Sequence, residues 1–223
     1  MKSKILQNPL FITLISGVIG IATGGLSSFW GLRIQINLLK EENRILRLEK
    51  NLNETETLSF EFFELMNNRF YSMQRVYWAL EAYKHEEADY CYADYQVLKN
   101  EWNQRVHQIQ EKYTFLGNQK MADLVIDRKD ARDYREETKS VHAAFVRAHY
   151  DLRDFYRGKD YQEEKRRSLE LQALESLKNL SEWIKHFKRA CSEDFKQRDQ
   201  DFVDQLSYNK ATDCEVQRCK LRG

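Results

Sequence analysis

The feature that most constrains this chain is a long uncharged stretch near its N-terminus. Residues 5–32, a run of 28, contain no Asp, Glu, Lys or Arg. A helix needs about 20 apolar residues to cross the hydrocarbon core of a bilayer. The stretch therefore predicts a single transmembrane helix over residues 9–32, preceded by a short flank of residues 1–8. Pro9 suits the first turn of a helix, and Trp30 suits a membrane interface.

A cleaved signal peptide is the alternative interpretation of the same stretch. Lys2 and Lys4 would form its basic region, and Ala22-Thr23-Gly24 offers a small-residue cleavage site. Against this, the uncharged stretch continues past Gly24 without a polar break, and it is long for the core of a signal peptide. We therefore favour a retained anchor in contact with a lipid bilayer.

Basic residues beside the predicted helix indicate its orientation. Two lysines precede it, whereas five basic residues lie between residues 33 and 50. Basic flanks tend to stay in the cytoplasm, so we expect the N-terminus outside and the C-terminal domain in the cytoplasm, as at a bacterial inner membrane. The four cysteines fit neither a disulfide framework nor a paired zinc motif, which predicts reduced thiols and agrees with this placement.

The anchor carries small residues at every fourth position. Such a stripe lets two helix backbones approach closely, so it predicts self-association and a homo-oligomer. The alternative is that small residues are simply tolerated in membrane helices, and the sequence leaves the two open. The stripe consists of Ser16, Gly20, Gly24 and Ser28.

Residues 33–52 follow the anchor with the three- and four-residue spacing of a coiled-coil seam. The seam consists of Ile34, Leu38, Ile45, Leu48 and Leu52, and Glu41 interrupts it. We expect it to continue the anchor helix and to support the same oligomer. Packing on the protein's own later helices is the open alternative.

The rest of the chain predicts an all-α fold, because it holds few glycines, no proline and no alternating strand pattern. Apolar residues at three- and four-residue spacing predict four helices over residues 53–87, 89–116, 119–157 and 160–206. Asn53 with Glu56 is a candidate capping box for the first helix, Asp160 with Glu163 is one for the fourth, and Gly117 should end the second. The apolar seam of the third helix consists of Tyr134, Thr138, Val141, Phe145, Ala148, Leu152 and Phe155. Long helices with such seams pack as an elongated antiparallel bundle, here residues 53–206. Residues 207–223 have no periodicity and predict a flexible tail.

Two arginines lie on predicted apolar faces and are candidates for buried charges. Arg69 falls between Leu65 and Met73, and Arg128 is placed similarly beside Leu124. A buried guanidinium needs a carboxylate or helix-end carbonyls, so we expect an ion pair that fixes helix register. A buried polar site, or a charge that specifies a partner, is the alternative.

The histidines do not form a metal site by spacing. Glu81 with His85, and Glu182 with His186, are four residues apart, rather than the three of a di-iron bundle, and we expect exposed pairs. His142 and His149 are seven apart beside one seam, where flanking residues that extend to solvent are the favoured interpretation over a shared ligand or a proton-sensitive spot.

Composition and motifs narrow the function. The formal net charge is +1, so the chain has no overall electrostatic attraction for nucleic acid. We expect its many aromatic residues to pack in the core. The chain lacks glycine-rich phosphate loops and the G-x-S-x-G motif. The sequence thus predicts no enzyme, no cofactor and no metal, but a membrane-tethered scaffold that self-associates and presents its bundle to a protein partner. A membrane-acting effector that forms pores is the alternative, and a metal-binding bundle is disfavoured.

Overall fold

The computed structural model describes the backbone of residues 9–127 and 139–220, and the side chains of residues 32–204 other than Leu38 and residues 128–138. This described part confirms the all-α class. Its helices are α1 Pro9–Glu81, α2 His85–Phe115, α3 Gln119–Val125, α4 Val141–Arg157 and α5 Glu163–Lys220. The chain divides into two compact units, residues 1–50 and 51–223.

The predicted transmembrane helix gains no support from the structure. Within the residues that the structure describes, no helix is both long and apolar enough to cross a membrane. The side chains of residues 9–31 lie outside the described residues, although the backbone there belongs to α1.

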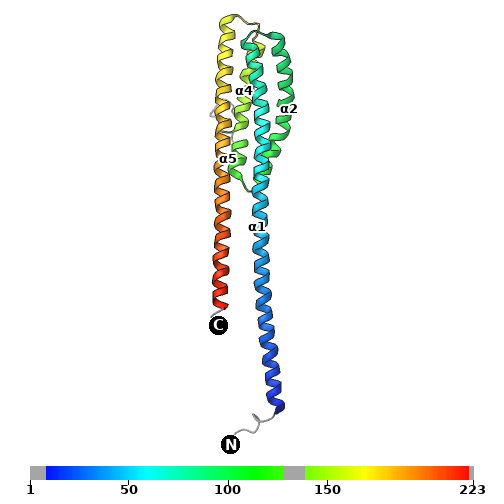
Figure 1. Ribbon diagram of the computed structural model, residues 1–223. Coiled ribbons are helices and arrows are strands. Elements are labelled where there is room, and N and C mark those ends of the chain that lie inside the picture. Colours follow the sequence, from blue (N-terminus) through cyan, green and yellow to red (C-terminus); the bar gives the residue numbers. More distant parts are fainter. Residues whose placement is uncertain (1–8, 128–138, 221–223) are drawn as a thin grey trace. The chain divides into compact units, whose positions relative to one another are not determined.

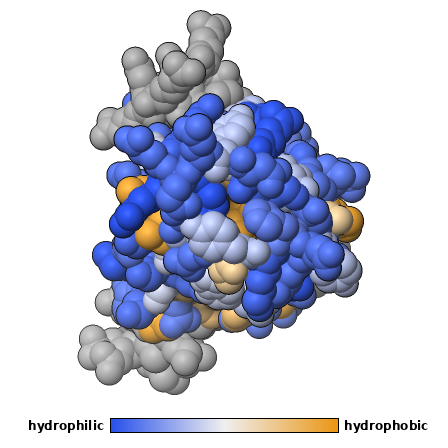
Figure 2. All heavy atoms as spheres, turned by 90° about the horizontal axis from the view of Figure 1, so that it is seen from above, coloured by the Kyte–Doolittle hydropathy of each residue, from blue (hydrophilic) through white to orange (hydrophobic). Residues whose placement is uncertain are grey.

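The described residues from 51 onward form a helical bundle, which the sequence predicted for residues 53–206. The part of α1 from residue 51, together with α2, α4 and α5, runs up, down, up and down, so that neighbouring helices are antiparallel (Figure 1). The turn between α1 and α2 and the turn between α4 and α5 lie at the same end. Seen from above, hydrophilic residues cover most of the surface, with scattered hydrophobic ones between them (Figure 2).

The core contains the residues that the apolar periodicity selects. In α1 it takes Leu58, Phe62, Leu65, Met66, Met73, Tyr77 and Leu80, and in α4 it takes Val141, Phe145, Ala148, Leu152 and Phe155. Phe62 joins three helices, because its ring centroid lies 5.5 Å from that of Trp102 in α2 and 5.0 Å from that of Phe187 in α5. The two buried cysteines described, Cys91 and Cys191, are free thiols, as predicted.

The first helix ends earlier than predicted, at Glu81 rather than near residue 87, and it runs through Asn53 without a capping box. Its end is a Schellman turn, in which the Lys84 amide donates to the Ala79 carbonyl and the Tyr83 amide to that of Leu80. Tyr83 adopts a φ of 55°, which usually requires glycine. The α2 helix ends in the same way at Gly117, with a φ of 72°, as the sequence predicts.

The turn at Tyr83 is held by the start of α5. The Arg166 guanidinium donates to the Leu80 carbonyl at 2.6 Å and lies 3.7 Å from the Tyr83 ring centroid. The Tyr83 hydroxyl donates to the Glu163 carboxylate at 3.0 Å. These contacts compensate for the unfavourable backbone conformation of Tyr83.

The predicted single helix over residues 119–157 is wrong. The short helix α3 ends at Val125, Ile126 is extended, and α4 begins at Val141 with the Ser140 hydroxyl accepting from the Ala143 amide at 3.2 Å. Residues 127–139 contain ten charged side chains, so they offer little apolar surface to hold a helix on the core. Tyr134 and Thr138, which we expected on the seam, lie outside the described residues.

The last helix differs from the prediction at both ends. It begins at Glu163, so Asp160 does not cap it. Its backbone stays helical to Lys220, through residues expected to form a flexible tail. No glycine or proline lies between residues 159 and 222, and a stretch without breakers can extend a helix beyond its apolar face.

Candidate functional site

The most unusual buried group is Arg69, in the middle of α1. Its side chain is 2% exposed, as we expected. The predicted ion pair is absent among the described residues. The guanidinium instead lies between two aromatic rings, 5.0 Å from the Trp102 centroid and 4.8 Å from the Phe145 centroid. Cation–π contacts of this kind are strongest where water is excluded.

The two aromatic faces leave the edge of the guanidinium incompletely satisfied. Arg69 Nε and Nη1 are buried and have no hydrogen-bond partner. The Tyr95 hydroxyl interacts with the guanidinium and favours its charged form. Burial lowers the pKa of Arg69, although an arginine still keeps its proton at neutral pH.

Two histidines of α4, the helix that contains Phe145, join this cluster. The Trp102 indole N–H donates to His142 Nδ1 at 3.0 Å. His149 Nδ1 lies 2.7 Å from the Tyr95 hydroxyl. An indole nitrogen only donates, so His142 Nδ1 carries no proton. Both histidines therefore bind the neighbouring helix, which is a correction to the expectation that they extend to solvent.

The electrostatic surroundings of both histidines are cationic. Burial, followed by Arg69 and His107, lowers the pKa of His142 to about 4. Burial, followed by Lys99, lowers the pKa of His149 to about 4 as well. The cluster is thus a buried polar layer with one permanent cation and two neutral imidazoles at pH 7.

This layer has no arrangement for nucleophilic or metal chemistry. Among the side chains that the structure describes, no group of three or more His, Cys, Asp or Glu could hold a metal ion. The Cys191 thiol is buried, which raises its pKa to about 12 and keeps it unreactive. The layer is therefore suited to specifying helix packing and to responding to protons.

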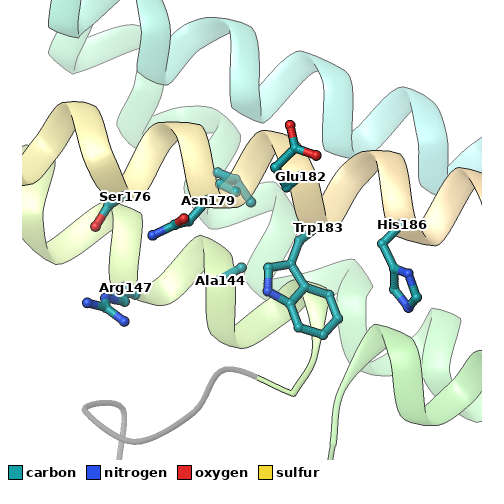
Figure 3. A pocket seen from close by; sticks show the side chains of 8 residues that line it. Ala144, Arg147, Ser176, Asn179, Glu182, Trp183 and His186 are labelled. Atoms are coloured by element: carbon teal, nitrogen blue, oxygen red, sulfur yellow. The ribbon is translucent and has the colours of Figure 1, made fainter.

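A surface groove of about 560 Å³ lies between α4 and α5 (Figure 3). Arg147 of α4 lies on one side of it, and Trp183 and His186 of α5 lie along the other. Glu182 is paired with Lys185 at 2.6 Å, and the Ser176 hydroxyl donates to the Asp151 carboxylate. The groove thus combines a guanidinium and an indole, which suits non-covalent contact with an acidic or aromatic group.

The other residues predicted for function fall mainly outside this layer. The side chains of Ser16, Gly20, Gly24 and Ser28, and all of Arg128, lie outside the described residues. In the predicted seam, Ile34 and Leu48 are each 36% exposed. Ile45 and Leu52 are partly buried, and the side chain of Leu38 is not among those described.

Sequence reasoning placed too many aromatic residues in the core. Phe60, Tyr71 and Trp78 of α1 are exposed, and the rings of Tyr71 and Trp78 meet edge to face with centroids 6.5 Å apart. Tyr71 lies eleven residues after Phe60, and Trp78 lies seven residues after Tyr71. Each spacing returns to nearly the same side of a helix, so the three residues share a helix face distinct from the core face. A separate count of heptad positions along this region would have identified that face.

Comparison with known proteins found no matching family, no matching curated protein and no matching solved structure.

Proposed function

We propose that this protein is a membrane-tethered scaffold, which self-associates through its N-terminal segment and presents a helical bundle to a protein partner. In this proposal residues 9–32 form the anchor, the N-terminus lies outside, and the bundle lies in the cytoplasm. The uncharged stretch over residues 5–32 and the basic residues that follow it support the anchor and its orientation.

The observation that carries the proposal is the length of α1. This helix extends from Pro9 to Glu81, so one element contains residues 9–32 of the uncharged stretch and the first helix of the bundle. Its residues 51–81 supply core side chains such as Phe62 and Met73. A tether that shares a helix with the bundle suits a protein that holds a partner close to a membrane.

The composition of the bundle supports binding in preference to catalysis. The rings of Trp102 and Phe145 cover the buried guanidinium of Arg69. The features that a partner could reach are two surfaces of the bundle. These surfaces are the α4–α5 groove and the aromatic face formed by Phe60, Tyr71 and Trp78. Aromatic residues and arginine dominate the binding energy of many protein interfaces.

The self-association is tested by enlarging the small residues of the anchor. Replacing Gly20 and Gly24 by Leu should weaken oligomerisation in lipid about tenfold, because close packing of two backbones is lost. Ala22→Leu is the matched control, since at 100° per residue Ala22 lies on the opposite side of the helix. Chemical cross-linking in vesicles, read against protein-to-lipid ratio, measures the change.

Two results would contradict this proposal. A protein that stays monomeric in vesicles at every ratio does not self-associate. A protein that leaves the membrane on washing with carbonate at high pH is not anchored in it. The protein partner is sought by affinity capture of the full chain from native membranes, with a variant in which Tyr71 and Trp78 are both replaced by Ser as the comparison.

A further inference from the structure

Residues 32–50 of α1 carry two apolar faces, and the faces lie on opposite sides of the helix. One is the predicted seam that begins at Ile34. The other begins two residues earlier, and two residues correspond to about 200° around a helix. Its apolar side chains are more exposed than the described side chains of the predicted seam. They are Leu32 at 58%, Ile36 at 50%, Leu39 at 57% and Leu46 at 55%.

This second face has the composition of a parallel two-stranded coiled coil. Counted in heptads, Leu32, Leu39 and Leu46 occupy successive d positions, and Ile36 and Asn43 occupy the a positions between them. A β-branched residue at a with Leu at d favours two strands. A single Asn at an a position fixes register and a dimeric state, at some cost in stability.

The flanking charges fit a second copy of the chain in parallel register. Glu42 occupies a g position and Arg47 the following e position, which face each other between the two strands of a parallel dimer. Neither makes an ion pair with another side chain described by the structure. Two such pairs would form in a symmetric dimer, one on each side of the seam.

The predicted seam that begins at Ile34 is a poorer surface for a second copy. It places Glu41, whose carboxylate lies 3.6 Å from Arg44 in the same helix, at a core position. Counted onward in steps of three and four residues, its positions reach Thr55, Ser59, Phe62 and Met66, which are buried within the chain's own bundle. The periodicity of this seam therefore matches the intrachain core.

We infer that two copies of the chain associate through Leu32, Ile36, Leu39, Asn43 and Leu46 as a parallel coiled coil. This inference rests on the proposed function, because the face covers fewer than three heptads and such a coil is marginal by itself in water. Two anchors in one membrane would hold the segments at high effective concentration and in parallel orientation. The predicted seam then remains on the outside of the dimer.

Oxidative cross-linking of the full chain in vesicles tests this assignment. Cys214 and Cys219 are first replaced by Ser, and the buried Cys91 and Cys191 are kept. Asn43→Cys at the dimer axis should then form an interchain disulfide with copper phenanthroline, because paired a positions bring Cα atoms within disulfide range. Ile45→Cys, on the opposite side of the helix, is the matched control and should remain mainly monomeric.

The outcomes separate this inference from the proposed function. Cross-linking of Ile45→Cys without that of Asn43→Cys assigns the dimer to the predicted seam and overturns the inference, while self-association stands. If neither cysteine variant forms a disulfide while a lysine-reactive reagent still captures oligomers, the inference is also overturned. Failure of both in a protein that is monomeric in vesicles overturns the inference and the proposed self-association together.

A charge reversal gives a second and independent test. Glu42→Arg and Arg47→Glu should each lower the dimer fraction several-fold, because each places like charges opposite one another. The double reversal should restore the dimer fraction to near that of the natural chain. Equal effects of the single and double reversals would show that the two residues do not face each other between copies.

Discussion

Acid should loosen the bundle through the two histidines of α4, since both are neutral at pH 7 and engage α2 through Nδ1. His142 Nδ1 accepts from the Trp102 indole, and His149 Nδ1 lies 2.7 Å from the Tyr95 hydroxyl. The pKa of each is lowered from 6.5 to about 4 in the folded chain. The unfolded chain therefore binds these protons first. Their contribution to stability is fully present above pH 6.5, falls as the pH decreases, and is lost as the pH passes through 4.

The size of this effect follows from the two pKa values. Between pH 8 and pH 5, His142 should lower the free energy of unfolding by about 2 kcal/mol, and the more exposed His149 by about 1 kcal/mol, because solvent screens its interactions. For a chain of this size, 1 kcal/mol corresponds to roughly 2–4 °C in melting temperature. The midpoint should therefore fall by roughly 6–12 °C, measured by circular dichroism at 222 nm.

A variant separates these histidines from the other titrating groups. Replacing both His142 and His149 by Asn keeps an acceptor near the Nδ1 position but removes the titration, so most of the decrease between pH 8 and pH 5 should disappear. His186→Asn, at an exposed position of α5, should leave the decrease unchanged. A double variant that melts with the pH dependence of the natural chain would refute the assignment.

Three further substitutions test local features of the fold by urea denaturation. Arg69→Met should leave the free energy of unfolding unchanged or raise it by about 1 kcal/mol, because it removes a buried cation without a carboxylate partner; a loss above about 3 kcal/mol would contradict this. Gly117→Ala should cost about 1 kcal/mol, since its φ of 72° disfavours a side chain. Ser140→Ala should lower the free energy of unfolding by a similar amount, because the N-cap of α4 is lost. Ser140→Asp should keep most of the stability, because its carboxylate can accept the same hydrogen bond.

Periodicity predicted most of the bundle, because the core is built from one face of each helix. The spacing of Val141, Phe145, Ala148 and Leu152 identified the buried face of α4. Gly117 marked the end of α2, because glycine adopts the left-handed backbone conformation of a helix end at little energetic cost. These features depend on local geometry, which a single sequence contains.

Features that depend on the partner helix were not predictable in the same way. Arg69 was expected to find a carboxylate, but Trp102 and Phe145 come from helices distant in sequence. The break after Val125 was missed because a regular heptad count continues through the charged residues that follow. The exposure of Tyr71 and Trp78 was missed because an aromatic residue on a long helix shows its periodicity but not which face is covered.

The contact of Phe62 with α5 has a consequence for how the chain folds during synthesis. Its partner Phe187 follows 125 residues later, and contacts so distant in sequence slow folding. The first pair of helices must leave the ribosome with its apolar face uncovered and wait for α5. A ribosome paused before residue 187 would hold an aggregation-prone hairpin, so translation speed and chaperone binding over this interval should govern the yield of folded protein.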